Sequence, residues 1–277
     1  DDDINVIQDE VSTNHHRPQN DLTLLFEQEL SLEAIRNIQS ALHLVYEQVV
    51  DVAQELYPDE WKFLKPKLMT IASWVGYDLD GRSDIGWNDT LLTRVNVSIF
   101  QLSYYEAALD GICGLDIDAK SKDALENAKA LLVETRRHSE KALELLPNAG
   151  TDTAVTAQLA QHYMATQDKR LVDTASILEV LSHTLEQSQN AEVQKKLFIL
   201  RSEVANYGLA MAHTHVRLNA TQLHNAIRRQ IGITGDPDAS GNRRFFLQEL
   251  TELLENVEPV SINFGSILTE GTSAKRL

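Results

Sequence analysis

Apolar side chains recur every three or four residues over long stretches of this chain, which is the pattern of amphipathic α-helices. The clearest stretch runs from Ser31 to Tyr57 and ends before Pro58. Its steps of three and four predict one apolar face made of Ile35, Ile38, Leu42, Val45, Val49, Val52 and Leu56. We expect a long bundle helix, and a coiled coil remains the alternative, because three heptads are the minimum for that assignment.

Six further helices follow from the same periodicity. We place them at Asn88–Ile112, Lys120–Leu146, Ala154–Ala165, Leu171–Ser188, Ala191–Tyr207 and Arg243–Glu255. The second of these is predicted to stop at Pro147, because proline lacks the amide hydrogen that a helix interior needs. Short turns between the helices predict that neighbours run antiparallel.

Three short stretches are partly β-branched and bounded by loops, glycine or proline, which favours strands. They are Leu68–Val75, Leu209–Leu218 and Val260–Ile267. Residues 1–20 are polar and acidic and are predicted to be a disordered leader. Gly232–Asn242 is predicted to be a flexible loop. The expected fold class is therefore mainly α, with long antiparallel helices and a few short strands in one helix-rich domain over residues 21–277.

Composition narrows the class of protein. With 277 residues and 43% hydrophobic side chains, the chain can bury a substantial core, which excludes a wholly disordered protein. Its net charge of −16 argues against nucleic acid or an anionic membrane as a partner. No stretch approaches the roughly 20 apolar residues of a membrane helix. The single cysteine, Cys113, excludes an intramolecular disulfide and predicts a cytoplasmic location.

One stretch that could carry chemistry is Ser73–Arg82, with the sequence Ser-Trp-Val-Gly-Tyr-Asp-Leu-Asp-Gly-Arg. Two acids, one base and two glycines between a strand and a helix suit a binding loop. The alternative is that Asp78 and Asp80 only form turns and cap backbone amides. An EF-hand calcium loop is disfavoured, because Gly81 comes fourth rather than sixth and Arg82 takes the fifth place.

The other stretch surrounds the predicted strand that carries His213, His215 and Arg217. Side chains alternate along a strand, so these three share one face. A His-x-His pair can hold a metal, although further ligands must then come from other strands. Taken singly, each histidine is more often a hydrogen-bonded core or surface residue. An arginine on a strand either pairs with an acid or binds an anion.

Together the two stretches resemble phosphoenolpyruvate carboxylases, in particular their divergent bacterial branch. The family carries Ser-Trp-x-Gly-Gly-Asp-Arg-Asp-Gly-Asn after a strand, which residues 73–82 match, and a later strand ending near Asp-x-Arg-Gln, which His215-Val216-Arg217-Leu218 matches. The resemblance covers most of the chain, from about residue 22 to residue 277, and indicates an internal fragment of a longer enzyme.

Three positions depart from the family pattern: Tyr77 replaces the second glycine, Leu79 the arginine, and Arg82 the final asparagine. Because one arginine is lost and another gained in the same loop, we hypothesise that Arg82 supplies the cation missing at Leu79.

The resemblance implies an eight-stranded β/α barrel wrapped in extra helices, to which this chain contributes a few strands and a helical insertion. It implies a homotetramer that joins phosphoenolpyruvate and bicarbonate to give oxaloacetate and phosphate, with Mg²⁺ or Mn²⁺. It assigns a catalytic role to Arg217 and substrate binding to Trp74, Asp78, Asp80, Gly81, Arg82 and His215.

The family's essential histidine segment, its mobile loop and its metal-holding Glu and Asp have no match in this chain. We therefore expect the chain to need the remainder of the enzyme for activity and to hold no metal tightly. We also expect its parallel strands, without their barrel neighbours, to be frayed, swapped or paired with another copy. Two other functions stay open: a stand-alone helical interaction or sensor module, and a metal hydrolase that uses His213 and His215.

Overall fold

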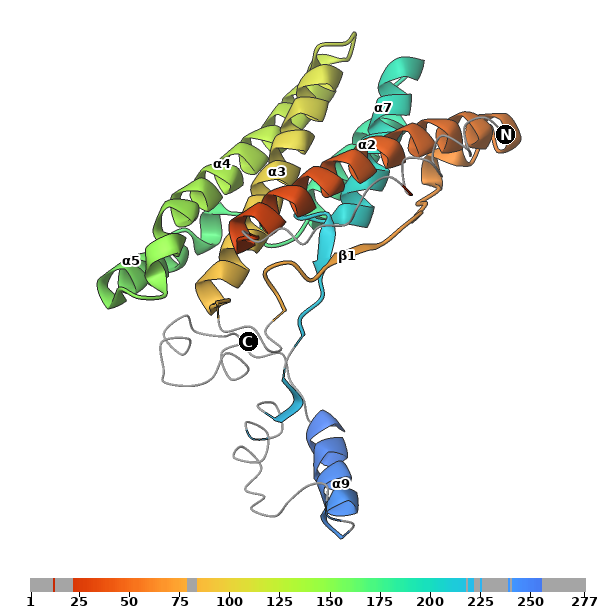
Figure 1. The fold of residues 1–277 in the computed structure, drawn as a ribbon. Helices are drawn as coiled ribbons and strands as arrows, with labels where there is room; N and C mark the ends of the chain where they lie inside the picture. The colour runs from red at the N-terminus through yellow and green to blue at the C-terminus, as the bar shows by residue number, and fades with distance from the viewer. Residues whose placement is uncertain are drawn as a thin grey trace.

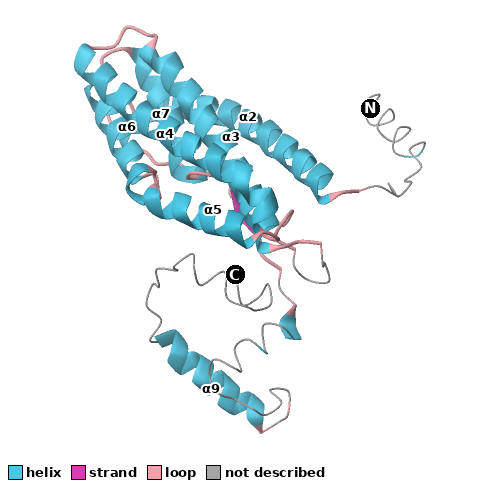
Figure 2. Cartoon of the chain, turned by 90° about the vertical axis from the view of Figure 1, so that its left-hand side faces the viewer, coloured by secondary structure: helices cyan, strands magenta, loops and turns pink. Residues whose placement is uncertain are grey.

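The computed structural model describes residues 22–78, 84–217, 219–221 and 241–255, together with Ser12, Asn225 and Ala239. It is mainly helical with a few short strands, which confirms the mainly α class expected from the sequence. The helices are α2 (Leu24–Leu56), α3 (Trp87–Cys113), α4 (Ala119–Ala149), α5 (Thr153–Ala165), α6 (Ala175–Gln187), α7 (Ala191–Tyr207) and α9 (Asn242–Glu255). Helices α2 to α7 form a bundle, and α9 is drawn apart from it (Figures 1 and 2).

Helix α2 begins at Leu24, seven residues before the predicted start. The side chain of Thr23 accepts a hydrogen bond from the amide of Phe26 at 3.2 Å and caps the first turn. The predicted apolar face is confirmed at Ile35 and Leu42, which are buried, but the buried face is turned away from most of its other residues. The residues of α2 that are buried are Ile35, Gln39, Leu42, Tyr46, Val50 and Ala53.

Four residues of the predicted apolar face of α2 are exposed instead, namely Ile38, Val45, Val52 and Leu56. We call them the outer stripe of α2. Apolar residues therefore cover about half of the circumference of α2. Only the part of this apolar surface that is centred near Leu42 and Tyr46 packs against the other helices. Periodicity located the helix, but it could not show which part of a wide apolar arc meets the bundle.

The main core lies between α2, α3, α4, α6 and α7, where Tyr46, Leu102, Leu132, Leu181 and Phe198 are buried. Helices α3 and α4 pack along each other, and α6 packs on α7 (Figures 1 and 2). A smaller cluster joins the start of α3, the end of α4 and α5 through Trp87, Ala142, Leu146, Ala149 and Leu159. None of the described helices is long and apolar enough to cross a membrane.

Pro147 does not end α4, which continues to Ala149. Its ring removes one backbone hydrogen bond of the last turn. Two contacts hold that turn in place all the same. Ala149 is buried in the smaller cluster, and the hydroxyl of Thr156 on α5 donates to the carbonyl of Ala149. These contacts with α5 therefore add to the backbone hydrogen bonds of the turn that contains the proline.

A buried polar cluster joins α2, α3 and α7. Glu203, 1% exposed, accepts hydrogen bonds from the hydroxyl of Tyr104 at 2.8 and 3.0 Å. Its carboxylate also lies 2.9 Å from Nδ1 of His43. Three helices therefore share one carboxylate, which the apolar pattern of α7 did not predict.

The two predicted strands within the described residues are shorter than expected. They are β1 (Ile71–Ser73) and β2 (Ala212–Thr214), and they pair in parallel with Ala72 opposite His213. The third predicted strand, Val260–Ile267, lies outside the described residues, and so do most of the predicted leader and of Gly232–Asn242. Helices α3 to α7 form the connection between β1 and β2, which is the kind of crossover that parallel neighbours require.

Candidate functional site

The carboxyl ends of β1 and β2 bring the two candidate stretches together. The parallel pairing continues beyond the strands, because the amide of His215 donates to the carbonyl of Ser73 at 2.9 Å and the amide of Arg217 donates to that of Tyr77 at 3.0 Å. Asp78 and Arg217 then form an isolated parallel bridge. Residues far apart in the sequence thus emerge side by side at one end of the strand pair.

A tight turn over residues 74–77 leads from β1 to Asp78, with the amide of Tyr77 donating to the carbonyl of Trp74. Gly76 has φ +82°, and a Cβ there would lie 2.4 Å from Oγ1 of Thr93. Thr90 on α3 also donates to the carbonyl of Gly76 at 2.9 Å. The turn needs glycine for both its backbone conformation and its close approach to α3.

Gly76→Ala is expected to lower the free energy of unfolding by about 2–4 kcal/mol, because it adds both backbone strain and a steric clash with Thr93. Urea unfolding followed by circular dichroism measures this. The matched control is Gly111→Ala on α3, where a Cβ meets nothing within 4 Å. That change is expected to stabilise the helix by about 0.5–1 kcal/mol. Equal effects of the two substitutions would contradict this account of the turn.

Asp78 and Arg217 form an ion pair, with Nη1 of the arginine 2.9 Å from Oδ2 of the aspartate. The Arg217 side chain is 59% exposed and that of Asp78 is 20% exposed. An arginine on a strand pairs with an acid or binds an anion, and here the acid comes from the other candidate stretch. The exposed guanidinium keeps donors for a further group.

The remaining predicted site residues differ in what the structure gives for them. Trp74 is 57% exposed and stands directly after β1. His215 is exposed, and its backbone rather than its side chain joins the strand pair. Asp80, Gly81 and Arg82 lie outside the described residues.

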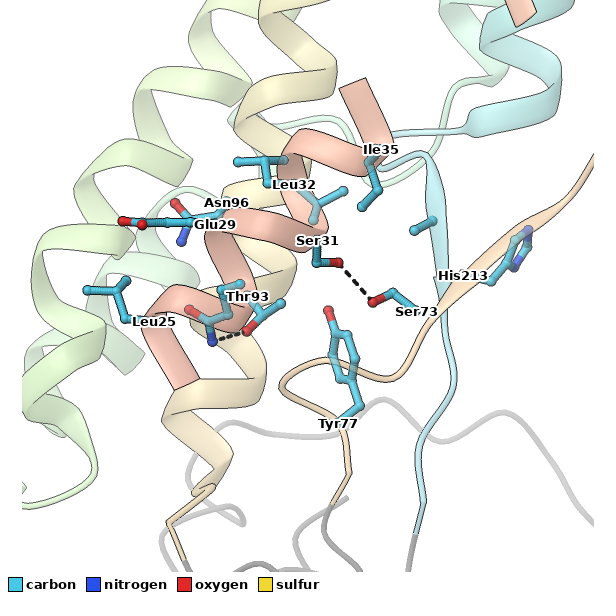
Figure 3. A pocket seen from close by; sticks show the side chains of 13 residues that line it. Leu25, Glu29, Ser31, Leu32, Ile35, Ser73, Tyr77, Thr93, Asn96 and His213 are labelled. Carbon is cyan, nitrogen blue, oxygen red and sulfur yellow. Dashed lines mark hydrogen bonds between the residues drawn. The ribbon is translucent and has the colours of Figure 1, made fainter. Parts of the chain in front are cut away.

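A cavity of about 210 Å³ lies between the start of α2, the start of α3 and the strand pair (Figure 3). Its polar lining is mostly uncharged. Ser31 and Ser73 share a hydrogen bond of 3.2 Å, and Gln28 donates to the hydroxyl of Thr93 at 2.5 Å. Glu29 contributes the carboxylate among the lining residues. The hydroxyl and amide groups of this cavity can bind a neutral polar ligand. An anion would need the positive charge of Arg217 at the strand ends.

Tyr77 is buried and directs its hydroxyl toward the Ser31–Ser73 pair (Figure 3). Burial raises the pKa of Tyr77 to about 12, with partial opposition from Arg94, so the hydroxyl stays protonated near neutral pH. Its side chain therefore lines the cavity beside the turn as a neutral group.

Sequence reasoning missed most of the cavity lining. Ser31, Gln28 and Thr93 occupy ordinary helical positions, and nothing in their spacing indicated that the starts of α2 and α3 lie beside the strand pair. Arg94 was missed too, although its guanidinium donates to the carbonyl of Ala212 at 2.6 Å and fixes β2. The available signal was an arginine inside a helix stretch that is otherwise largely uncharged.

The two histidines of the His-x-His pair are exposed, and the imidazole of His213 points away from Ser73 and Tyr77 (Figure 3). In the part of the chain that the structure describes, no group of three His, Cys, Asp or Glu residues is placed to hold a metal ion. Comparison with protein families, with curated proteins and with solved structures found no match. The site must therefore be interpreted from its own geometry.

Proposed function

We propose that this chain forms part of a phosphoenolpyruvate carboxylase and that Arg217 binds phosphoenolpyruvate. The observation that carries the proposal is the meeting of Asp78 and Arg217, 139 residues apart, at the carboxyl ends of two parallel strands. In parallel β/α sheets and barrels, substrates bind at this end of the strands. The order of strand, acidic loop, long helices and arginine-bearing strand is also the order of the family resemblance.

The reaction explains why such a site needs a fixed cation. A phosphoryl group moves from phosphoenolpyruvate to bicarbonate, and the enolate left behind attacks the carboxyl carbon. Both steps place negative charge on oxygen, which preorganised donors stabilise. The planar guanidinium of Arg217 suits a phosphate or carboxylate group. In a chain of charge −16, a local cation of this kind also offsets the general repulsion of an anionic substrate.

We assign Asp78 as a positioning residue, because its carboxylate holds the guanidinium at the strand ends. Trp74 would form a wall of the site once further parts of the enzyme cover it. The family's Mg²⁺ or Mn²⁺ supplies positive charge beside the phosphate when bound. In this proposal its ligands belong to the remainder of the enzyme. In this proposal the remainder of the enzyme, the tetramer and the cytoplasmic location follow the family.

Titration calorimetry with phosphoenolpyruvate tests the anion site on this chain itself. We expect weak binding, with a Kd of about 1–10 mM, because only part of the site is present. Arg217→Gln should abolish it. Asp78→Asn keeps a side-chain oxygen that can accept the hydrogen bond from the guanidinium and removes the negative charge beside it, so it should tighten binding. Equal heats of phosphoenolpyruvate binding for the wild type and Arg217→Gln would contradict the proposal.

The hypothesis about Arg82 has its own test in the complete enzyme. Arg82→Ala is expected to lower kcat/KM for phosphoenolpyruvate about tenfold, because one charge-assisted contact is lost. Restoring the family arginine in the double variant Leu79→Arg/Arg82→Ala should recover part of the loss. Unchanged kcat/KM for both substrates in Arg82→Ala would show that this arginine does not replace the missing cation.

A further inference from the structure

A cleft of about 400 Å³ opens between α2, α3 and α7, and its described lining residues all belong to these three helices. Its walls are made of small and branched apolar side chains, namely Ala107, Ala108, Ile112, Ile199 and Leu200. Gly111 adds room beside them, because a Cβ there would meet nothing within 4 Å. A cavity of this size with apolar walls and a few polar groups is typical of small-molecule sites.

The polar lining of the cleft centres on His43, whose side chain is 40% exposed. Its Nδ1 lies 2.9 Å from the carboxylate of Glu203, which is 1% exposed. Its Nε2 lies 3.9 Å from the carboxylate of Glu47, which is too long for a hydrogen bond. The Glu47 side chain is 39% exposed, so its carboxylate can accept a hydrogen bond from a ligand.

Charge restricts what the cleft can bind. Each lysine of the lining already pairs with a carboxylate: Lys195 with Asp51 at 2.6 Å, and Lys196 with Glu192 at 3.4 Å. These two pairs are neutral as a whole. The carboxylates of Glu47 and Glu203 then face a single imidazole, so negative charge is in excess even when His43 is protonated. An anion is repelled here, whereas a cation is stabilised.

We propose that this cleft binds a small primary amine with an apolar body. The ammonium is a compact charge with three donors, and it donates to the exposed carboxylate of Glu47, close to the buried charge of Glu203. The apolar body lies on Ile112, Ile199 and Leu200 and removes their surface from water. This site does not depend on the anion site at Arg217, so either can fail alone.

The proton of His43 competes with such a ligand. The groups that face His43 are Glu47 on its own helix, Tyr104 on α3 and Glu203 on α7. The hydrogen bond to Glu203 raises the pKa of His43 above 6.5, against the effect of burial. Loss of this proton leaves both carboxylates uncompensated. The affinity for the amine should therefore rise about threefold to tenfold between about pH 6 and pH 8.5, where the amine itself stays protonated.

The probe is n-hexylamine, titrated into the full ¹⁵N-labelled chain and followed by the amide signals of Gly111 and Ile112. We expect a Kd of about 0.1–1 mM at about pH 8, which is ordinary for a ligand of this size. Hexanoate has the same apolar body with a negative head group, and it should not bind. The neutral 1-hexanol should bind at least about tenfold more weakly than the amine.

Three variants keep the test specific. Glu47→Gln should weaken hexylamine binding about fivefold, and Gly111→Leu, which fills the cleft, about tenfold. In His43→Gln the affinity should no longer change with pH. The control is Glu55→Gln, which removes an exposed carboxylate of the same helix outside the cleft and should leave binding unchanged. Urea unfolding shows whether each variant is folded.

Three results would overturn the proposal. The first is the absence of hexylamine binding up to about 10 mM. The second is hexanoate binding as tight as that of hexylamine, because the cleft would then not select a cation. The third is equal affinity for hexylamine in Glu47→Gln and Glu55→Gln, which would show that the amine responds only to the net charge of the chain.

Discussion

Arg217→Ala is expected to lower kcat/KM for phosphoenolpyruvate by about 100-fold to 1,000-fold in the complete enzyme. In the proposed function, the guanidinium of Arg217 at the carboxyl ends of β1 and β2 stabilises the negative charge that develops on oxygen. Removing one preorganised charged donor of this kind costs about 3–4 kcal/mol of transition-state stabilisation. Steady-state assays at saturating bicarbonate measure the effect.

Arg137→Ala is the matched control for Arg217→Ala. Arg137 lies on α4, its side chain is 62% exposed, and it also pairs with a carboxylate, that of Glu134. Its removal should leave kcat/KM unchanged, because the pair is exposed and Arg137 does not line the cavity beside the strand pair. Similar kcat/KM for both variants and the wild type would show that Arg217 does not contact the substrate.

Glu203→Ala is expected to lower the free energy of unfolding by about 3–5 kcal/mol. The substitution leaves the hydroxyl of Tyr104 and the imidazole of His43 without their shared acceptor and opens a cavity between three helices. Urea unfolding measures the loss. The control on the same helix is Glu192→Ala, because Glu192 is exposed and its pair with Lys196 is 3.4 Å long. That change should cost less than about 1 kcal/mol.

The same cluster makes stability depend on pH. The hydrogen bond to Glu203 raises the pKa of His43 above its ordinary value of 6.5, and burial opposes part of that rise. A further carboxylate, that of Glu47, lies 3.9 Å from Nε2 and acts in the same direction. Burial and the nearby Glu203 raise the pKa of Tyr104, which keeps this hydroxyl neutral.

The direction in which stability changes with pH follows from the raised pKa of His43. A raised folded-state pKa means that the protonated imidazole stabilises the fold fully below pH 6.5, and that this contribution is lost as pH rises through the raised value. Unfolding free energies measured from about pH 6 to pH 9 should therefore fall. In Glu203→Gln, which keeps the shape and loses the charge, the same curve should be flatter. A curve for the wild type that rises over this range would contradict the assignment.

Helices were the part of the fold that the sequence could predict. The helix assigned to Ala191–Tyr207 coincides with α7, because apolar periodicity is a local signal. A predicted helix boundary was wrong where a tertiary contact outweighed the rule that proline ends a helix. At Pro147, the contact of Thr156 on α5 with Ala149 stabilises the last turn of α4. The direction of the buried face of α2 also depended on its neighbours. A wide apolar arc does not reveal which half is covered.

The site was predictable only in part. The sequence indicated that Arg217 needs an acid or an anion, but it did not show that the acid is Asp78. That pairing depends on the register of two three-residue strands, which no local pattern fixes. The buried Glu203 was missed for a similar reason. It belongs to a mainly apolar stretch of α7, and only the approach of His43 and Tyr104 makes its burial possible.

We propose that this chain belongs to an enzyme that carboxylates phosphoenolpyruvate through Arg217. The most direct measurement supplies ¹⁴C-bicarbonate, phosphoenolpyruvate and Mg²⁺ to the purified natural gene product that contains this chain, and traps oxaloacetate as malate. We predict acid-stable ¹⁴C in malate, released with one phosphate per carbon fixed, and its near loss in Arg217→Ala. Phosphoenolpyruvate that stays unconsumed, or ¹⁴C incorporation that Arg217→Ala leaves unchanged, would contradict the claim.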